Sequence, residues 1–127
     1  MIANTVEVLT LFVDDIGAAK TFYARVFAPR ILYEDEVSAV LEFGTLMINL
    51  LQHTQAPELV APLPVAPSSA GPRMLLTIKV GNVDEVCADL ASVGMSLLYG
   101  PIDRPWGRRT AAFADPSGHV WEVAQEI

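Results

Sequence analysis

Residues 8–13, Val-Leu-Thr-Leu-Phe-Val, have a counterpart in residues 75–80, Leu-Leu-Thr-Ile-Lys-Val, in the other half of the chain. Both segments are rich in β-branched and other apolar residues, which is typical of β-strands. When the two segments are aligned, the threonines Thr10 and Thr77 coincide. Such identities are weak by themselves, and they gain weight from the elements that follow each segment.

The same order of elements is predicted in both halves of the chain. In the first half, the patterns predict a strand, a helix and three strands at residues 6–13, 16–28, 30–33, 37–43 and 45–51. In the second half, they predict the same series at residues 74–80, 83–93, 96–99, 109–114 and 119–124. The repeated order indicates two βαβββ modules and an α+β fold.

Residues that favour helix ends mark both predicted helices. Asp14 and Asp15 precede the first helix and Asn82 precedes the second, and such side chains accept hydrogen bonds from the first backbone N–H groups. Pro29 stops the first helix, and Gly94 provides a left-handed residue at the end of the second.

A proline-rich segment, residues 54–72, separates the two halves and holds five of the nine prolines. Because proline fixes φ and cannot donate to a strand ladder, this segment is expected to be a mobile, semi-extended connector. The predicted organisation is therefore one domain with a first module at about 4–53 and a second at about 73–127.

The amino-acid composition argues against several classes of function. The chain has 127 residues and 52% hydrophobic residues, enough for one domain with a core. The net charge of −7 argues against nucleic acid or an anionic membrane as a partner. One cysteine cannot form an internal disulfide, and no apolar run reaches the length of a membrane span. We expect a cytoplasmic protein.

Three segments resemble the vicinal oxygen chelate superfamily, which includes glyoxalase I, extradiol dioxygenases and bleomycin-resistance proteins. They are residues 9–27, 78–94 and 100–123, and the last contains Pro-Trp-Gly followed by Asp-Pro-x-Gly-x-x-x-Glu. The resemblance covers nearly the whole chain. It implies two βαβββ modules whose curved mixed sheets surround a shared cleft, and a homodimer.

The metal enzymes of this superfamily hold a divalent cation with a His on the first strand and a Glu on the last strand of a module. The resemblance places Val8 and Leu75 at the His positions. The first carboxylate position falls on Ile48, or on Asn49 if the register shifts by one, and Glu122 matches the second. A single carboxylate does not hold an ion at ordinary concentrations. We expect no metal, no cofactor and no catalytic residue.

Glu122 and Trp106 are the main candidates for ligand binding. Strand alternation places Glu122 opposite Trp121 and Val123, so Glu122 points into the cleft if those two pack on helices. Its alternative role is a solvated strand carboxylate, or a relic of the family's metal site that pairs with a nearby Arg. Trp106 lies in a loop rich in Pro, Gly and charge, where it would stack on a ligand or pack against the sheet.

Three further candidates complete the site. Arg108 belongs to a cluster with Arg104 and Arg109 that either receives an anionic group or forms surface ion pairs. Phe12 lines the cleft or packs in an interface, and Asn49 stands beside the first carboxylate position. His53 and His119 occupy no ligand position of the family, and we expect both at the surface.

Three functions compete. The first is a small-molecule binding protein of the bleomycin-resistance type, which sequesters an aromatic, cationic ligand such as an antibiotic without metal-dependent catalysis. The second is a metal-dependent lyase or oxidoreductase of the glyoxalase or dioxygenase type with a non-standard ligand set. The third is a silent dimeric accessory domain without a ligand.

Overall fold

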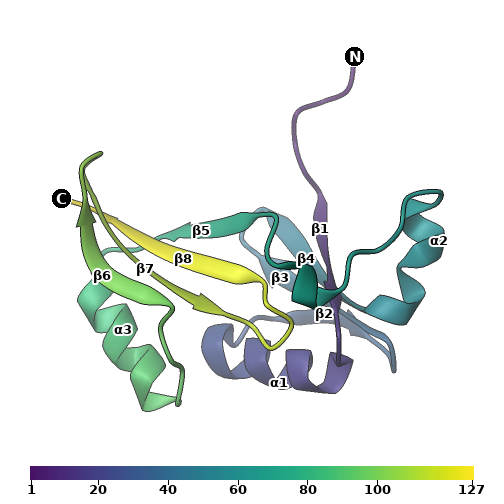
Figure 1. The fold of residues 1–127 in the computed structure, drawn as a ribbon, viewed down its shortest axis with the longest axis horizontal. Helices are drawn as coiled ribbons and strands as arrows, with labels where there is room; N and C mark the ends of the chain where they lie inside the picture. Colours follow the sequence, from purple (N-terminus) through teal and green to yellow (C-terminus); the bar gives the residue numbers. More distant parts are fainter. The chain divides into compact units, whose positions relative to one another are not determined.

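The chain forms two compact units, residues 1–68 and 69–127, in a computed structural model that describes all residues from Met1 to Ile127. The division falls inside the predicted connector. Each unit contains a four-stranded sheet and a helix against it (Figure 1). The predicted α+β class and the two βαβββ modules are confirmed.

The first unit follows the predicted order of elements. Its elements are β1 (Val8–Val13), α1 (Ile16–Phe27), β2 (Ile31–Glu34), β3 (Ser38–Phe43), β4 (Leu46–Gln52) and the short helix α2 (Pro57–Val60). The sheet order is β1-β4-β3-β2, with β1 parallel to β4 and the other neighbours antiparallel.

The second unit repeats this topology. Its elements are β5 (Leu75–Lys79), α3 (Val83–Ser92), β6 (Tyr99–Arg104), β7 (Arg108–Ala114) and β8 (Val120–Glu126). The sheet order is β5-β8-β7-β6, with β5 parallel to β8. Figure 1 shows α3 along one face of this sheet, and the sheet's other face carries no helix of the same unit.

Both helices begin as predicted and are held to the last strand by a glutamine. The Asp15 carboxylate accepts from Ala18 N at 3.0 Å, and the Asn82 amide oxygen accepts from Glu85 N at 3.0 Å. Gln52 Oε1 accepts from Ile16 N at 2.9 Å in the first unit. Gln125 Oε1 accepts from Val83 N at 2.8 Å in the second. These bonds satisfy N–H groups that a helix leaves without partners.

The core lies between each helix and its sheet. In the first unit, Leu11 and Val13 of β1 are buried, as are Phe22 and Tyr23 of α1. In the second unit, the buried residues include Val83 and Leu90 of α3 and three from β7 and β8, namely Phe113, Trp121 and Val123. Along β1 and β5, more deeply buried side chains on the helix side alternate with more exposed ones on the other face of the sheet.

The sixth strand was predicted wrongly. The pattern indicated a strand at 96–99, and the structure forms β6 at Tyr99–Arg104, so the two ranges share only Tyr99. The sequence pattern did not indicate a strand here because the segment contains Pro101, and proline is expected only at edges and bulges of sheets. Here it lies in an edge strand, and the register with β7 shifts between Tyr99 and Ile102.

The connector also contains regular structure. Besides α2, it holds short 3₁₀ turns at His53–Gln55 and Ser68–Ala70. Pro57 begins α2, at the first helical position where a missing N–H costs nothing. The semi-extended prediction is therefore wrong for these residues. No helix in the structure is both long and apolar enough to cross a membrane.

Candidate functional site

Glu122 lies on the open face of the second sheet. Gln125 and Arg109, which are register partners, contact α3 residues Val83 and Asp84 and so define the helix side. Side chains alternate along a strand, so Glu122, three residues before Gln125, points to the opposite side. This agrees with the predicted direction of Glu122.

A row of four residues crosses the open face at this level. Thr77 of β5 pairs with Glu122, Glu122 pairs with Ala112 of β7, and Ala112 pairs with Tyr99 of β6. The small Ala112 side chain lies between Tyr99 and Glu122. The long side chains of these two residues therefore meet above it.

Two hydroxyl groups hold the Glu122 carboxylate. Thr77 donates from its hydroxyl to Oε1 at 3.0 Å, and Tyr99 donates from its hydroxyl to Oε2 at 3.0 Å. Burial, and then the hydrogen bond to Glu122, raises the pKa of the Tyr99 hydroxyl above 10.0. Tyr99 is therefore a hydrogen-bond donor at neutral pH, and the carboxylate is oriented by two donors from different strands.

Arg104 lies beside this group and stacks on two aromatic rings. Its guanidinium carbon is 5.0 Å from the centre of the Tyr99 ring and 5.7 Å from that of Trp106. Its Nε donates to the hydroxyl of the buried Thr110 at 3.0 Å. The guanidinium is thus fixed on the open face by one hydrogen bond and two cation–π contacts.

Gly100 shapes the strand that positions Tyr99. Its φ is 94°, a left-handed conformation that favours glycine. A Cβ at this position would lie 2.5 Å from the Thr110 carbonyl oxygen and 2.7 Å from the Ala111 Cα. Only glycine allows β6 to approach β7 this closely, and the local register shift places Tyr99 opposite Ala112.

The predicted Trp106 and Arg108 lie in the same hairpin. Trp106 is in the turn between β6 and β7 and is 66% exposed, so most of its ring is accessible. Arg108 is the register partner of Arg104 and of Glu126. It forms an ion pair with Glu126 at 3.3 Å, so its positive charge is balanced by a carboxylate of the protein.

The predicted Phe12 and Asn49 lie on the open face of the first sheet. Thr10 pairs with Asn49, Asn49 with Val40, and Val40 with Tyr33, which is the same arrangement as the Glu122 row. Asn49 Nδ2 is 3.5 Å from Thr10 Oγ1, at the limit of a hydrogen bond. Phe12 is half-buried on the same strand face as Thr10.

This register decides between Ile48 and Asn49. Thr10 is the counterpart of Thr77, which pairs with Glu122, so the residue opposite Thr10 is the counterpart of Glu122. That residue is Asn49. Ile48 is 1% exposed and faces the helix side, so the alternative that placed it at the carboxylate position is wrong.

Comparison with known proteins identifies the family. The model of the glyoxalase/bleomycin resistance protein/dioxygenase superfamily matches residues 5–123. The chain belongs to this superfamily. The resemblance seen in the sequence is confirmed.

The individual proteins that the chain resembles share less than 30% of their residues with it. A virulence protein of Salmonella typhimurium is 28% identical over 130 residues, covering 100% of this chain and 88% of that protein. A glyoxalase/bleomycin resistance protein/dioxygenase from Nocardioides has a TM-score of 0.85 at 21% identity, covering 100% of this chain and 86% of its own. A lactoylglutathione lyase from Agrobacterium tumefaciens has a TM-score of 0.74 at 20% identity, covering 97% and 94%. At these identities the two structures show the fold alone.

The metal positions of the superfamily are not occupied by a ligand set in this chain. Val8 and Leu75, at the His positions, offer only hydrocarbon, and Asn49 replaces the first carboxylate. No group of three or more His, Cys, Asp or Glu residues is placed to hold a metal ion. The residues present do not fit a divalent cation, which needs about four or more converging ligands.

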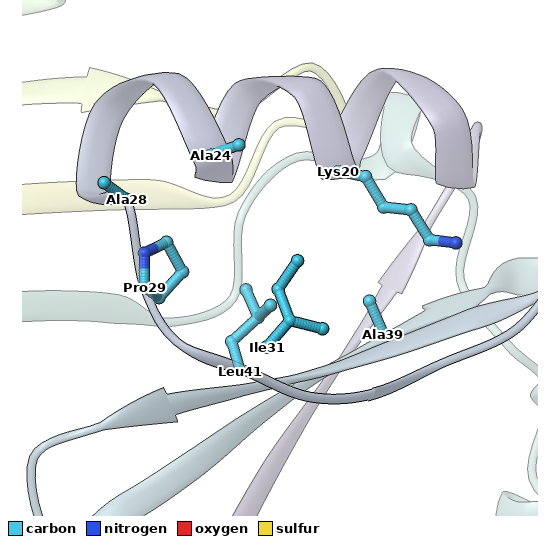
Figure 2. A pocket seen from close by; sticks show the side chains of 7 residues that line it. All are labelled: Lys20, Ala24, Ala28, Pro29, Ile31, Ala39 and Leu41. Atoms are coloured by element: carbon cyan, nitrogen blue, oxygen red, sulfur yellow. The ribbon is translucent and has the colours of Figure 1, made fainter.

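A separate pocket of about 260 Å³ lies on the helix side of the first sheet. Figure 2 shows side chains of α1 above it and those of β2 and β3 below it. Its lining residues are Lys20, Ala24, Ala28, Pro29, Ile31, Ala39 and Leu41. None of them belongs to the predicted site, because Thr10, Asn49 and Phe12 lie on the opposite face of that sheet.

His119 differs from its prediction as a surface residue. It is half-buried, and its Nδ1 is 2.8 Å from Asp115 Oδ2. The other Asp115 oxygen accepts from the backbone N–H groups of Ser117 and His119, both at 2.9 Å. These bonds order the turn before β8, which is a structural role.

Sequence reasoning underestimated three members of this group. Tyr99 is not among the predicted site residues, Thr77 enters only through its alignment with Thr10, and Arg104 is one of three clustered arginines. The signal for Thr77 was its alignment with Thr10, which sets the register to Glu122. The roles of Tyr99 and Arg104 depend on the bulge at Gly100, which no pattern in the sequence indicated.

Proposed function

We propose that the protein binds and sequesters a small planar ligand that presents a hydrogen-bond donor, neutral or cationic, to Glu122. The observation that carries this proposal is the Glu122 carboxylate held on an open sheet face by Thr77 and Tyr99. A carboxylate oxygen has more than one acceptor position, so each Glu122 oxygen can accept another hydrogen bond. The two hydroxyls therefore orient the carboxylate and leave acceptor positions on its oxygens for a hydrogen-bond donor of the ligand.

Trp106 supplies apolar contact area near the guanidinium of Arg104 in this proposal. Its exposed ring lies at the hairpin tip, and Arg104 over Tyr99 and Trp106 links it to the Glu122 group. Stacking of an aromatic ligand on an indole contributes roughly 0.5–1.5 kcal/mol beyond the area that it buries. Aromatic antibiotics belong to this ligand class, which the bleomycin-resistance part of the superfamily name suggests.

Asn49 and Phe12 support binding at the first sheet. Asn49 Oδ1 is the one buried side-chain polar atom without a hydrogen-bond partner in the structure. An unsatisfied buried acceptor costs about 1–3 kcal/mol, so it favours a ligand that brings a donor. Phe12 adds an aromatic surface on the same strand face as Thr10.

The alternative function is a metal-dependent lyase or oxidoreductase, the type of protein that the lactoylglutathione lyase of Agrobacterium represents by name. That function needs a cation, and Val8, Leu75 and Asn49 do not provide its ligands. Elemental analysis of the purified protein tests it. One Zn, Fe, Mn or Ni per chain, retained after dialysis, would contradict the proposal of binding without metal-dependent catalysis.

Calorimetric titration with aromatic methyl esters tests the binding proposal. Methyl 4-aminobenzoate and the cationic methyl 4-(aminomethyl)benzoate should bind, and methyl 4-(dimethylamino)benzoate, which has no donor, should bind much more weakly. A charge-assisted hydrogen bond contributes roughly 1.5–3 kcal/mol, so Glu122→Gln should weaken the cationic ester about ten- to a hundredfold. Trp106→Ala should weaken all three esters.

Glu126→Gln is the matched control for Glu122→Gln. It removes the same charge from the same strand, and Glu126 is already paired with Lys79 and Arg108. Its effect on the esters should stay within about twofold. Equal effects of the two substitutions would show that overall charge, and not the Glu122 group, decides binding.

We also propose a homodimer. Strand β2 is a sheet edge, and its apolar residues are exposed: Ile31 by 48%, Leu32 by 41% and Tyr33 by 57%. Exposed edges with apolar residues favour pairing with another chain. Light scattering should give twice 13.7 kDa at micromolar concentration. Ile31→Lys should shift the mass toward the monomer, and a monomeric wild type would contradict the proposal.

A further inference from the structure

We propose that the Glu122 group includes an oxyanion subsite at Arg104, so that the ligand is a single-ring aromatic carboxylic acid that also carries an amine. This inference rests on the proposed function and defines its ligand class. It concerns the guanidinium of Arg104, which lies over the rings of Tyr99 and Trp106.

Arg104 differs from the other arginines of its hairpin in having no carboxylate partner. Arg108 pairs with Glu126 at 3.3 Å, and Arg109 pairs with Asp84 at 3.0 Å and with Asp103 at 2.9 Å. Arg104 interacts with hydroxyl groups instead: its Nε donates to Thr110 at 3.0 Å, and its guanidinium acts on the Tyr99 hydroxyl, whose pKa it lowers against the larger effect of burial. Its charge is therefore the one in this hairpin that no protein carboxylate neutralises.

The guanidinium is also prepared for an anion by its orientation. A guanidinium has five N–H donors in a planar fork, and Thr110 takes the one on Nε. The remaining donors on Nη1 and Nη2 match the geometry of a carboxylate. Because two rings and the buried Thr110 already restrict the side chain, little rotamer freedom is left to lose when an anion binds.

The spacing of the two charges determines the kind of ligand. Tyr99 connects them, since its hydroxyl donates to Glu122 at 3.0 Å while its ring lies under Arg104. The acceptor and the guanidinium are thus both held by Tyr99, one at its hydroxyl and the other over the face of its ring. A ligand with one ring between its amine and its acid can place the amine at Glu122 and the acid at Arg104.

The charge balance favours a carboxylate over a phosphate. Arg104 provides one positive charge, which a carboxylate neutralises. A phosphate monoester would bring an additional negative charge close to Glu122, in a protein whose net charge is already −7. The same fork would bind either group, so the two are compared directly below.

Four compounds test the subsite on the full chain. They are 4-(aminomethyl)benzoate, its methyl ester, which keeps the cationic amine but has no carboxylate, 4-(aminomethyl)phenyl phosphate and benzoate. We expect the acid to bind about tenfold more tightly than the ester and more tightly than the phosphate. Benzoate, which lacks the amine, should bind more weakly than the complete acid.

Arg104→Lys and Arg108→Lys form a matched pair, because each keeps the charge and removes the planar fork. Arg104→Lys should abolish most of the preference for the acid over the ester, and Arg108→Lys should leave it within twofold. Equal acid and ester affinities in the wild type would overturn the subsite. So would equal effects of the two substitutions, or tighter binding of the phosphate.

A measurement on the wild type covers the case in which Arg104→Lys does not fold. In a ¹H–¹⁵N spectrum, the acid should shift the Arg104 Nε–Hε signal, and the ester should leave it in place. An unmoved signal at saturating acid would contradict the subsite. Loss of the acid preference while both compounds bind would overturn only this inference, whereas failure of all compounds to bind would overturn the proposed function as well.

Discussion

The two modules share a backbone frame and differ in the polar groups on their open faces. In each module a threonine at the middle of the first strand pairs with a residue of the last strand, Thr10 with Asn49 and Thr77 with Glu122. The neutral Asn49 keeps a buried oxygen without a partner, whereas both oxygens of Glu122 accept hydrogen bonds.

The tyrosines at the outer end of these two rows differ in the same way. Tyr33 donates its hydroxyl at 2.9 Å to Asp35, two residues along its own chain segment. Tyr99 donates across the sheet to Glu122. The same topology thus supports a local turn in one module and a cross-sheet polar group in the other, so the fold does not determine where the polar site forms.

The largest effect is expected from Gly100→Ala, which tests why Tyr99 turns toward Glu122. The new Cβ would collide with the Thr110 oxygen at 2.5 Å, in a residue with φ of 94°. Strain of roughly 1–3 kcal/mol and a similar overpacking cost should lower the free energy of unfolding by about 3 kcal/mol. Urea denaturation measures this loss.

Gly107→Ala in the same hairpin is the control for this prediction. Gly107 has φ of 82° and no atom within 4 Å of an added Cβ, so only backbone strain of about 1–2 kcal/mol applies. Equal losses for Gly100→Ala and Gly107→Ala would show that close packing on β7 does not matter.

A smaller effect is expected from the glutamines that hold the helices. Gln52 bonds Ile16 N at 2.9 Å and donates to the Asp14 carbonyl oxygen at 2.6 Å, whereas Gln125 bonds Val83 N at 2.8 Å. Gln52→Ala should cost about 2–3 kcal/mol and Gln125→Ala about 1–2 kcal/mol in chemical denaturation. A larger loss for Gln125→Ala would contradict the expectation that the loss of stability grows with the number of hydrogen bonds that each glutamine makes.

Ion pairs give the next comparison. Arg109 joins α3 and β6 through Asp84 and Asp103, and its side chain is 29% exposed. Arg30 contacts Glu42 at 3.6 Å with 77% of its side chain exposed. Arg109→Gln should lower the thermal midpoint measurably, and Arg30→Gln should not, because exposed pairs contribute little. The difference should shrink in 1 M NaCl, and an unchanged difference would exclude an electrostatic origin.

The smallest effect concerns the two tyrosine hydroxyls. The hydrogen bond to Asp35 is the main cause that raises the pKa of Tyr33, whereas burial is the main cause for Tyr99. Asp35→Asn should therefore bring the pKa of Tyr33 close to its ordinary value. Glu122→Gln should lower the pKa of Tyr99 only in part, because burial remains. Tyrosine ¹³Cζ shifts between pH 9 and 12 measure both values.

The sign of the pH dependence follows from these raised values. Both tyrosines hold their protons more tightly in the folded state than in the unfolded chain. Their contribution to stability is complete below pH 10 and is lost as the pH rises through the raised folded-state pKa. A stability that does not fall in this alkaline range would contradict the two hydrogen bonds.

Elements with strong local signals could be predicted from the sequence. Asp15 and Asn82 begin the helices where predicted, and Gly94 has the expected left-handed φ of 81°. Strand β6 could not be predicted from its residues, because Gly100 and Pro101 disfavour a strand. Their pairing with β7 overrides this preference.

The residues of the candidate site also differ in how well the sequence alone could predict their positions. Strand alternation was enough to direct Glu122 to the face opposite the helix, since it depends only on the chain's own geometry. Ile48 and Asn49 remained open alternatives because a register between strands is a relation between distant segments. The structure selects Asn49, and this choice depends on hydrogen bonds to Thr10's strand.

By itself, the sequence determined the superfamily, the two-module order and the apolar residues at the metal positions, because repeats, caps and residue identities are local properties of the chain. Only the tertiary structure decided which polar groups meet. Thr77, Tyr99 and Glu122 come from three strands, and they converge because the register places them in one row. Arg104 is left without a carboxylate because the neighbouring carboxylates bind Arg108 and Arg109. Such partner choice depends on distances across the sheet, which residue types and their spacing do not specify.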